Sequence, residues 1–159
     1  MNNLQEFMKF FNKATLETYA GSGEETDSQR EGFIELEYKE GPWCYRDSYA
    51  GFFESWGQTV IWHDGKPFWT HLYGGGMVPE FHGNAEFAKQ TFTFLKKALT
   101  AGVQDDFKPR GPDNFKEGDW EYSCEWEGDV KNFKGSEKIL FQDKVVFTHD
   151  FLGGLIISR

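Results

Sequence analysis

A pattern of residues occurs twice along the chain, and this repetition constrains the fold more than any other feature of the sequence. The motif Glu-Gly-x-Trp-x-Tyr begins at Glu40 and again 77 positions later at Glu117. The offset then becomes 78, and Trp69–His71 matches Phe147–His149, with a pair of glycines after each. Two similar halves explain this ordered series of matches. The alternative is that β-meanders reuse Trp, Tyr and Gly independently.

Each half is expected to begin with an amphipathic helix. Apolar residues recur with the spacing i, i+3, i+4, i+7 over Leu4–Ala14, and Gly21 is expected to lie beyond the end of this helix. A second helix is expected at Asn84–Leu99, with Asn84 as its N-cap and Gly102 as its end.

Strands are expected after each helix. Apolar and charged residues alternate over Ile34–Tyr38, which predicts a strand with one solvated face, and Asp64-Gly65 predicts the turn of a hairpin. Three more strands are expected at residues 120–122, 139–141 and 145–147. The Ile34–Tyr38 strand has no clear counterpart in the second half, because prolines interrupt Asp105–Asn114.

These elements predict an α+β fold with an internal duplication of a helix followed by an antiparallel β-meander. The two helices would pack on curled antiparallel sheets. A length of 159 residues with 38% hydrophobic side chains suits one domain, made of two similar halves at about residues 1–80 and 81–159.

Charge and cysteine usage disfavour several classes of function. The 26 acidic residues outnumber the 17 basic ones, which argues against a direct nucleic-acid surface. The sequence lacks both a targeting signal and an apolar run of the ~18 residues that a membrane span needs, so a cytoplasmic protein without membrane contact is expected. Cys44 and Cys124 are far apart and have no Cys or His companion, so neither a zinc site nor a disulfide framework is indicated. No metal and no cofactor are expected.

Three strings of residues resemble a bacterial domain of unknown function: Tyr45–Tyr49, which reads Tyr-Arg-Asp-Ser-Tyr, Gly65–Trp69, and Gly153–Ile156. The first is the most specific, and the resemblance covers nearly the whole chain. Members of that family occur alone or behind an XRE-type helix-turn-helix, which implies a link to bacterial regulators. No helix-turn-helix is expected within this sequence, so the resemblance implies no DNA-binding role, and it implies no catalytic residues.

The strand at 43–49 carries the strongest candidates for a site. Alternation places Trp43, Tyr45, Asp47 and Tyr49 on one face and Arg46 on the other. A carboxylate among aromatic rings can line a pocket for a cationic or hydroxyl-bearing ligand. The alternative is that a backbone or hydroxyl donor simply satisfies this carboxylate.

His71 and His149 are matched positions in the two halves. The imidazoles would converge if the halves pack about a pseudo-twofold axis, but two histidines without a third ligand fall short of a zinc site. The alternative is that both fill space among rings. The candidate ligand-binding residues are thus Trp43, Tyr45, Arg46, Asp47, Tyr49, Trp62, Trp69, His71 and His149.

Three functions are compatible with this pattern. The leading hypothesis is a non-enzymatic binding or sensor module with an aromatic-lined pocket for a small apolar or cationic molecule. The first alternative is a small enzyme that uses Asp47 with Arg46, Tyr45 or His71. The second is a protein-interaction module of cystatin-like architecture, whose acidic strand face at 35–37 would form the contact surface.

Overall fold

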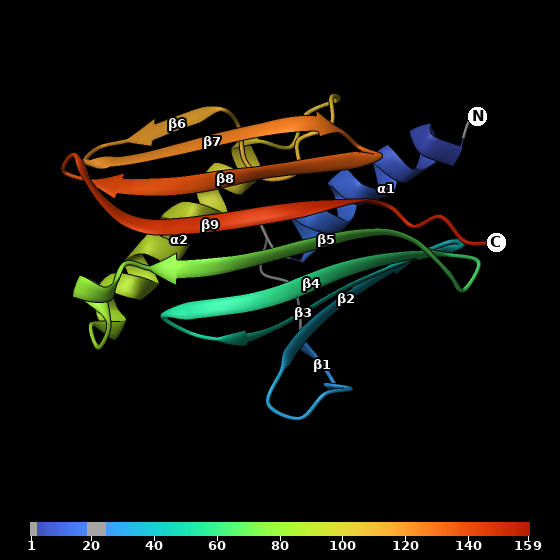
Figure 1. The fold of residues 1–159 in the computed structure, drawn as a ribbon, viewed down its shortest axis with the longest axis horizontal. Coiled ribbons are helices and arrows are strands. Elements are labelled where there is room, and N and C mark those ends of the chain that lie inside the picture. The colour runs from blue at the N-terminus through green and yellow to red at the C-terminus, as the bar shows by residue number, and fades with distance from the viewer. Residues whose placement is uncertain (1–2, 19–24) are drawn as a thin grey trace.

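The computed structural model describes residues 3–18 and 25–159 (Figure 1). The first half consists of α1 (Asn3–Glu17), β1 (Glu25–Thr26), β2 (Ile34–Glu40), β3 (Trp43–Gly51), β4 (Glu54–His63) and β5 (Lys66–Met77). A 3-10 turn (Pro79–Phe81) leads to the second half, which consists of α2 (Ala85–Ala101), β6 (Asn114–Glu117), β7 (Trp120–Asp129), β8 (Asn132–Phe141) and β9 (Lys144–Leu155).

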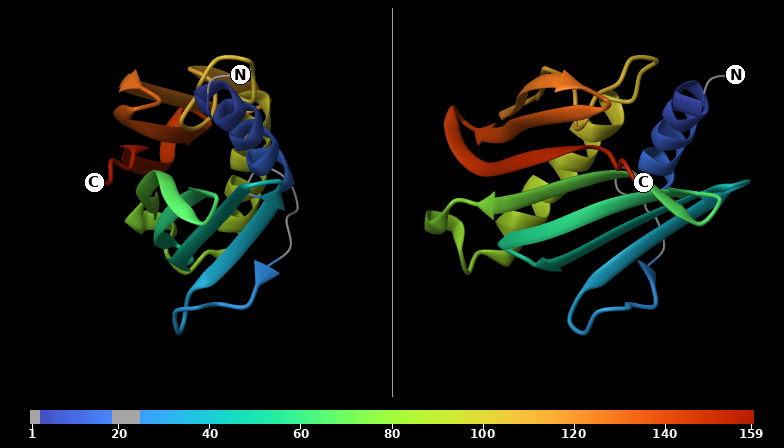
Figure 2. Two further views of the ribbon diagram at one scale, coloured as in Figure 1. Left: turned by 90° about the vertical axis from the view of Figure 1, so that its right-hand side faces the viewer. Right: turned by 45° about the vertical axis from the view of Figure 1, so that its right-hand side comes forward.

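All of these strands join one antiparallel sheet, in the order β1-β2-β3-β4-β5-β9-β8-β7-β6. The last strands of the two halves meet at the centre, where Tyr73 lies opposite Phe151. Both helices cover the same face of the sheet, as the two views of Figure 2 show. The predicted α+β class is therefore confirmed.

The two halves pair their strands in the same register. Gly57 lies opposite Tyr73 in the β4–β5 hairpin, and Gly135 lies opposite Phe151 in the β8–β9 hairpin, 78 positions later. Each hairpin also has one bulge, after Ile61 and after its counterpart Ile139. Residues at this offset therefore occupy the same place in the two hairpins.

The strand expected at Ile34–Tyr38, which is β2, does have a counterpart in the second half, and sequence reasoning missed it. Strand β6 pairs with β7 as β2 pairs with β3, with Glu117 opposite Trp120 and Glu40 opposite Trp43. It is only four residues long, too short for an alternating pattern to stand out, and it starts at the end of the proline-interrupted segment.

The predicted helices and hairpin turn are confirmed. The Asn84 side chain accepts a hydrogen bond from the Phe87 amide at 3.1 Å, and Gly102 follows α2 directly. The φ angles of Asp64 and Gly65 are 49° and 73°, the left-handed backbone of a primed turn. The expected helix end at Gly21 lies outside the described residues. Neither helix in the described part of the chain has the length and apolar character that crossing a bilayer requires.

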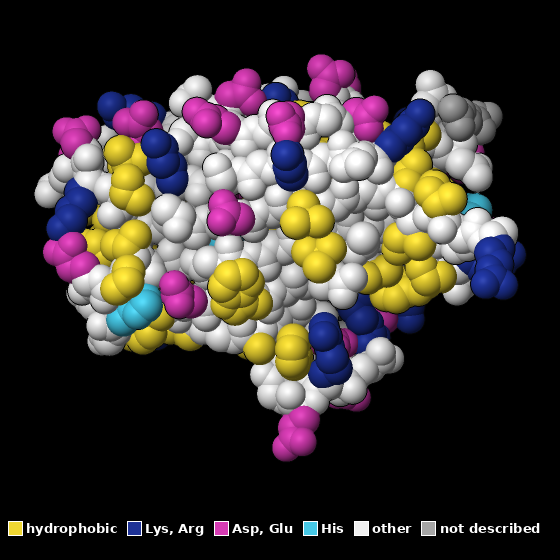
Figure 3. Space-filling model, viewed as in Figure 1, with side chains coloured by type: hydrophobic (Ala, Val, Ile, Leu, Met, Phe, Trp, Pro, Cys, Tyr) yellow, Lys and Arg dark blue, Asp and Glu magenta, His cyan; other side chains and the backbone are white. Residues whose placement is uncertain are grey.

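The face away from the helices is open (Figure 3). Three large apolar side chains are exposed along its central strands: Trp56, Leu72 and Leu152. The acidic residues of β2 were expected to be solvated, and this is wrong for Glu35, which is only 2% exposed. Arg46 binds it at 2.6 Å and also binds Glu37, so the proposed acidic contact surface is largely neutralised.

Candidate functional site

The larger of two hollows on the helix-covered side lies among α2, the residue that follows α1, and strands β1 to β5 and β9. Its volume is about 320 Å³, within the range of small-molecule pockets. Five aromatic side chains line it: Tyr49, Phe52, Tyr73, Phe92 and Phe147. Exposed Lys96 stands at its margin, and buried His149 is also part of its lining.

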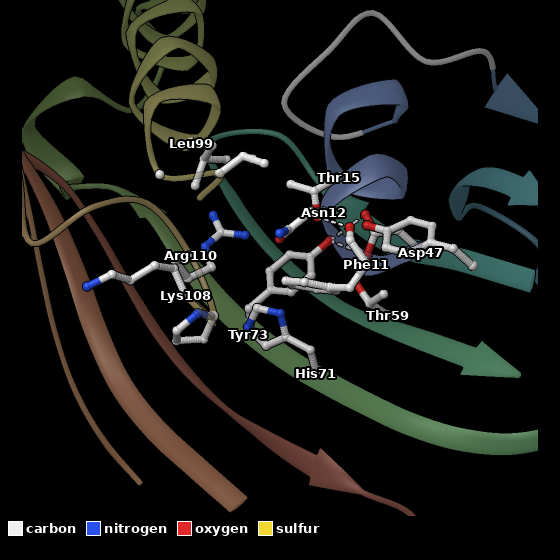
Figure 4. Close-up of a pocket in the computed structure, with 14 residues that line it drawn as sticks. Phe11, Asn12, Thr15, Asp47, Thr59, His71, Tyr73, Leu99, Lys108 and Arg110 are labelled. Atoms are coloured by element: carbon white, nitrogen blue, oxygen red, sulfur yellow. Dashed lines mark hydrogen bonds between the residues drawn. The ribbon is translucent and has the colours of Figure 1, made fainter. Parts of the chain in front are cut away.

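The smaller hollow is a cavity of about 30 Å³ beside Asp47 (Figure 4). Its walls come from α1, from β3 to β5 and from the loop after α2, and they include Tyr45, His71 and Arg110. This volume is room for about one water molecule. Tyr73 lines both hollows and so forms the wall between them.

Asp47 is fully buried and its carboxylate is satisfied by hydroxyl groups. Thr59 Oγ1 donates to Oδ1 at 2.9 Å, and the Tyr73 hydroxyl lies 2.9 Å from both carboxylate oxygens, as Figure 4 shows. Burial raises the pKa of Asp47 to about 6, although these two donors and the charge of Arg110 oppose that rise. This arrangement favours the alternative in which hydroxyl donors of the protein satisfy Asp47 over the alternative in which Asp47 binds a ligand.

An ion pair between Arg110 and Glu137 lies buried between the sheet and the loop after α2. Glu137 Oε1 accepts from Arg110 Nη2 at 2.6 Å and from His149 Nδ1 at 3.0 Å, and Oε2 accepts from the Tyr122 hydroxyl at 2.5 Å. Burial alone would raise the pKa of Glu137, but Arg110 and the His149 hydrogen bond together hold it well below its ordinary value.

Sequence reasoning did not single out either member of this ion pair. Arg110 stands in an irregular loop between two prolines, so no periodic pattern marks it as buried. Glu137 offered a weak signal, because it occupies an inward position of a strand two residues before Ile139, where an apolar side chain is expected.

The two matched histidines do not share a site. The Tyr73 ring lies between them, with centroid distances of 5.8 Å to His71 and 5.7 Å to His149. In both imidazoles, Nε2 is buried and has no hydrogen-bond partner among the described residues. Burial lowers the pKa of His71 to about 3 and also lowers that of His149, where the Glu137 hydrogen bond opposes the shift.

The structure separates the other sequence candidates. Trp43 and Trp69 belong to the core beneath α1, and Trp69 Nε1 donates to the carbonyl of Val130 at 2.9 Å. Arg46 and Trp62 lie on the face away from the helices, so Arg46 is not beside Asp47. Tyr49 and His149 line the larger pocket, and Tyr45, Asp47 and His71 line the smaller cavity.

No metal centre is formed by the residues that the structure describes. Among residues 3–18 and 25–159 there is no group of three His, Cys, Asp or Glu side chains arranged to hold an ion. Cys124 is buried, and burial, chiefly, raises the pKa of its thiol to about 12, so this thiol is unreactive at neutral pH.

Fold and hollows together define a class of α+β protein in which two helices cover one face of a single antiparallel sheet and leave a pocket beneath the second helix. Residues 47–156 match the family described as a domain of unknown function, DUF5680. The match spans more than half of the chain, which therefore belongs to this family. It includes both matched histidines and leaves α1 outside. Comparison with curated proteins and with solved structures yields no match.

Proposed function

We propose that the protein is a non-enzymatic binding module that takes a small, largely apolar molecule in the larger pocket. The observation that carries this proposal is a hollow of about 320 Å³ lined by five aromatic rings. Pockets of about this volume, lined mainly by hydrophobic and aromatic side chains, are the usual sites of small-molecule binding.

The second half of the molecule supports this proposal, because the same place is filled there. Ser55 lines the pocket, and its counterpart at the 78-residue offset is Phe133, which is 2% exposed. The Phe133 ring packs against Phe107 at 5.4 Å, and Phe107 packs against Trp126 at 5.8 Å. We infer that the halves arose by duplication on a curled sheet and that the small Ser55 side chain keeps one of two equivalent spaces open.

The enzyme alternative is less favoured by the geometry. Asp47, Tyr45 and His71 do line one cavity, but a volume of about 30 Å³ leaves no room for a substrate beside them. The proposal extends to a sensor role in the bacterial cytoplasm, as the resemblance to regulator-linked domains implies.

Filling the pocket tests the proposal. Ser55→Trp should abolish binding of naphthalene compounds, because the indole occupies their space as Phe133 does in the other half. Ser136→Trp is the matched control, since Ser136 is exposed on the open face of β8. Thermal unfolding with and without 2-naphthol and 2-methoxynaphthalene gives the readout. A melting temperature that neither compound raises in the wild-type protein, or raises equally in both variants, would contradict the proposal.

A further inference from the structure

An exposed indole ring lies on the open face of the sheet. Trp56 on β4 stands opposite Gly74 on β5, and a Cβ atom added at Gly74 would collide with the Trp56 ring. One face of the indole therefore packs on the Gly74 backbone, while 67% of Trp56 is exposed. The second half has no such platform, because Lys134 and Leu152 stand at the two corresponding positions.

An open hollow beside this ring is lined by polar residues only. Its volume is about 340 Å³, and six of its lining side chains belong to the open face: Ser123, Glu125, Ser136, Lys138, Thr148 and Asp150. Within residues 3–18 and 25–159, none of these six side chains forms a hydrogen bond or an ion pair. Elsewhere on the same face charges are paired, as in Arg46–Glu35 and Lys134–Glu127. The hollow thus presents hydroxyl, carboxylate and ammonium groups that can bind a ligand.

The indole and the hollow are neighbours across the sheet, on the face that Figure 3 shows. Gly74 stands opposite Trp56 on one side and opposite Asp150 on the other, and Asp150 in turn stands opposite Ser136. Adjacent strands are about 4.8 Å apart, so the ring over β5 lies one strand spacing from the Asp150 backbone on β9. A molecule stacked on the free face of the indole would therefore have its edge beside the polar groups of the hollow.

We infer that this part of the open face binds a neutral carbohydrate, with one sugar ring stacked on Trp56 and its hydroxyl groups hydrogen-bonded to the polar side chains of the hollow. A pyranose ring presents a flat face of C–H groups, which the negative face of an indole attracts. Its edge carries hydroxyl groups that both donate and accept hydrogen bonds.

Charge favours a neutral sugar over an acidic one. In the hollow, the carboxylates of Glu125 and Asp150 accompany the single ammonium group of Lys138, and the chain carries a net charge of -9. Acidic sugars and nucleotides would be repelled. The carbohydrate site lies on the opposite side of the sheet from the aromatic pocket and is independent of the function proposed for that pocket.

Titration with oligosaccharides tests the inference. Chitotetraose and cellotetraose, at millimolar concentrations, should shift the indole ¹H–¹⁵N resonance of Trp56, which is identified as the one missing from the spectrum of Trp56→Lys. The indole resonance of buried Trp69 should not move, because its N–H group donates to the carbonyl of Val130. A hyaluronan tetrasaccharide, which has similar rings but carries carboxylates, should bind about tenfold more weakly than chitotetraose.

Variants of two residues locate the site. Trp56→Lys should weaken binding of chitotetraose about tenfold, because the stacking surface is lost, whereas Trp56→Tyr keeps a flat ring and should bind nearly as tightly as the wild-type protein. Asp150→Leu introduces the residue found at the matched position, Leu72, and should also weaken binding. Exposed Glu86→Leu on α2, on the other side of the sheet, is the matched control and should not. Circular dichroism and thermal unfolding establish that each variant is folded.

Two results would overturn the inference directly: a Trp56 resonance that neither neutral oligosaccharide moves, or undiminished binding of chitotetraose to Trp56→Lys. Sedimentation provides a further check, because a wild-type dimer that Trp56→Lys dissociates would mean that a second copy of the chain covers the indole instead. Binding of naphthalene compounds in the aromatic pocket depends on none of these outcomes, so failure of the carbohydrate site and failure of the proposed function can be distinguished.

Discussion

The two halves of the molecule place their strands alike and use the space beneath the helices differently. In the first half, Ser55 leaves a pocket of about 320 Å³ under α2. In the second half, Phe133 and Phe107 occupy the equivalent place, and their rings lie 5.4 Å apart. One strand position that holds a hydroxymethyl group instead of a benzyl group thus distinguishes an open pocket from a filled core.

The buried carboxylates differ in the same way. Asp47 on β3 is satisfied by the neutral hydroxyls of Thr59 and Tyr73. In the second half the buried carboxylate lies on β8, where Glu137 stands at the position that corresponds to Thr59 and pairs with the charged Arg110. Neutral donors stabilise an ionised carboxylate less than a guanidinium does, so the two sites should respond oppositely to pH.

Removal of Arg110 should have the largest effect on stability. Arg110→Met leaves Glu137 as a buried carboxylate without its cationic partner, which should lower the free energy of unfolding by about 4 kcal/mol in urea denaturation. Lys134→Met is the control, because Lys134 and its partner Glu127 lie 3.0 Å apart with 73% and 72% of their side chains exposed, and loss of this pair should cost clearly less. Equal losses in the two variants would show that burial does not distinguish these ion pairs.

Phe133→Ser should make the filled half resemble the open one. Loss of a buried ring should reduce the free energy of unfolding by about 3 kcal/mol. The same change should create a second site for naphthalene, visible as a binding stoichiometry of two in calorimetric titration. Leu152→Ser serves as the control, because Leu152 is 57% exposed on the open face and its loss should cost less and add no site. A stoichiometry that stays at one would argue against equivalence of the two spaces.

Asp47→Asn should remove a pH dependence of stability. The pKa of Asp47 is raised in the folded protein from 3.8 to about 6, so folding retains a proton that the unfolded chain releases. The stabilisation by this proton is complete below pH 4 and is lost as the pH rises through about 6, a change of roughly 3 kcal/mol. Urea denaturation at pH 4 and pH 7 should show that loss in the wild-type protein and in exposed Asp143→Asn, but not in Asp47→Asn.

The smallest effect is expected on the open face. Trp56 is 67% exposed, and its counterpart in the second half is Lys134. Trp56→Lys should change the free energy of unfolding by less than about 1 kcal/mol and should leave binding of the naphthalene compounds intact. A larger loss in urea denaturation would mean that side chains on the open face contribute to stability as those on the helix-covered face do.

The elements that repeat a local pattern could be predicted, whereas the features that depend on distant residues could not. Periodicity predicted both helices, and the Asp64-Gly65 pair predicted its hairpin, because each depends on neighbours in sequence. Asp47 and His149 were candidates because polar residues among rings are conspicuous. The Arg110–Glu137 pair joins positions 27 residues apart through a loop without a pattern.

An aromatic-lined pocket was predicted, and Tyr49 and His149 do line one, but its place beside Ser55 was missed for a related reason. No pattern in the sequence marks Ser55. Its side chain matters because it is much smaller than that of Phe133 and leaves the pocket open. The internal match skipped it, since Ser55 and Phe133 are not identical. A repeat comparison that asks where side-chain size changes between matched positions would have pointed to this place.

The central pairing of β5 with β9 has a consequence for how the chain folds. Every other pair of strands that the structure describes joins neighbours along the chain, whereas this one brings Trp69 opposite Leu155 and Met77 opposite Phe147. Closing so long a segment is entropically slow compared with forming hairpins. Each half is therefore expected to assemble its own hairpins first, and docking of the two central strands should limit the rate at which the protein reaches its native state.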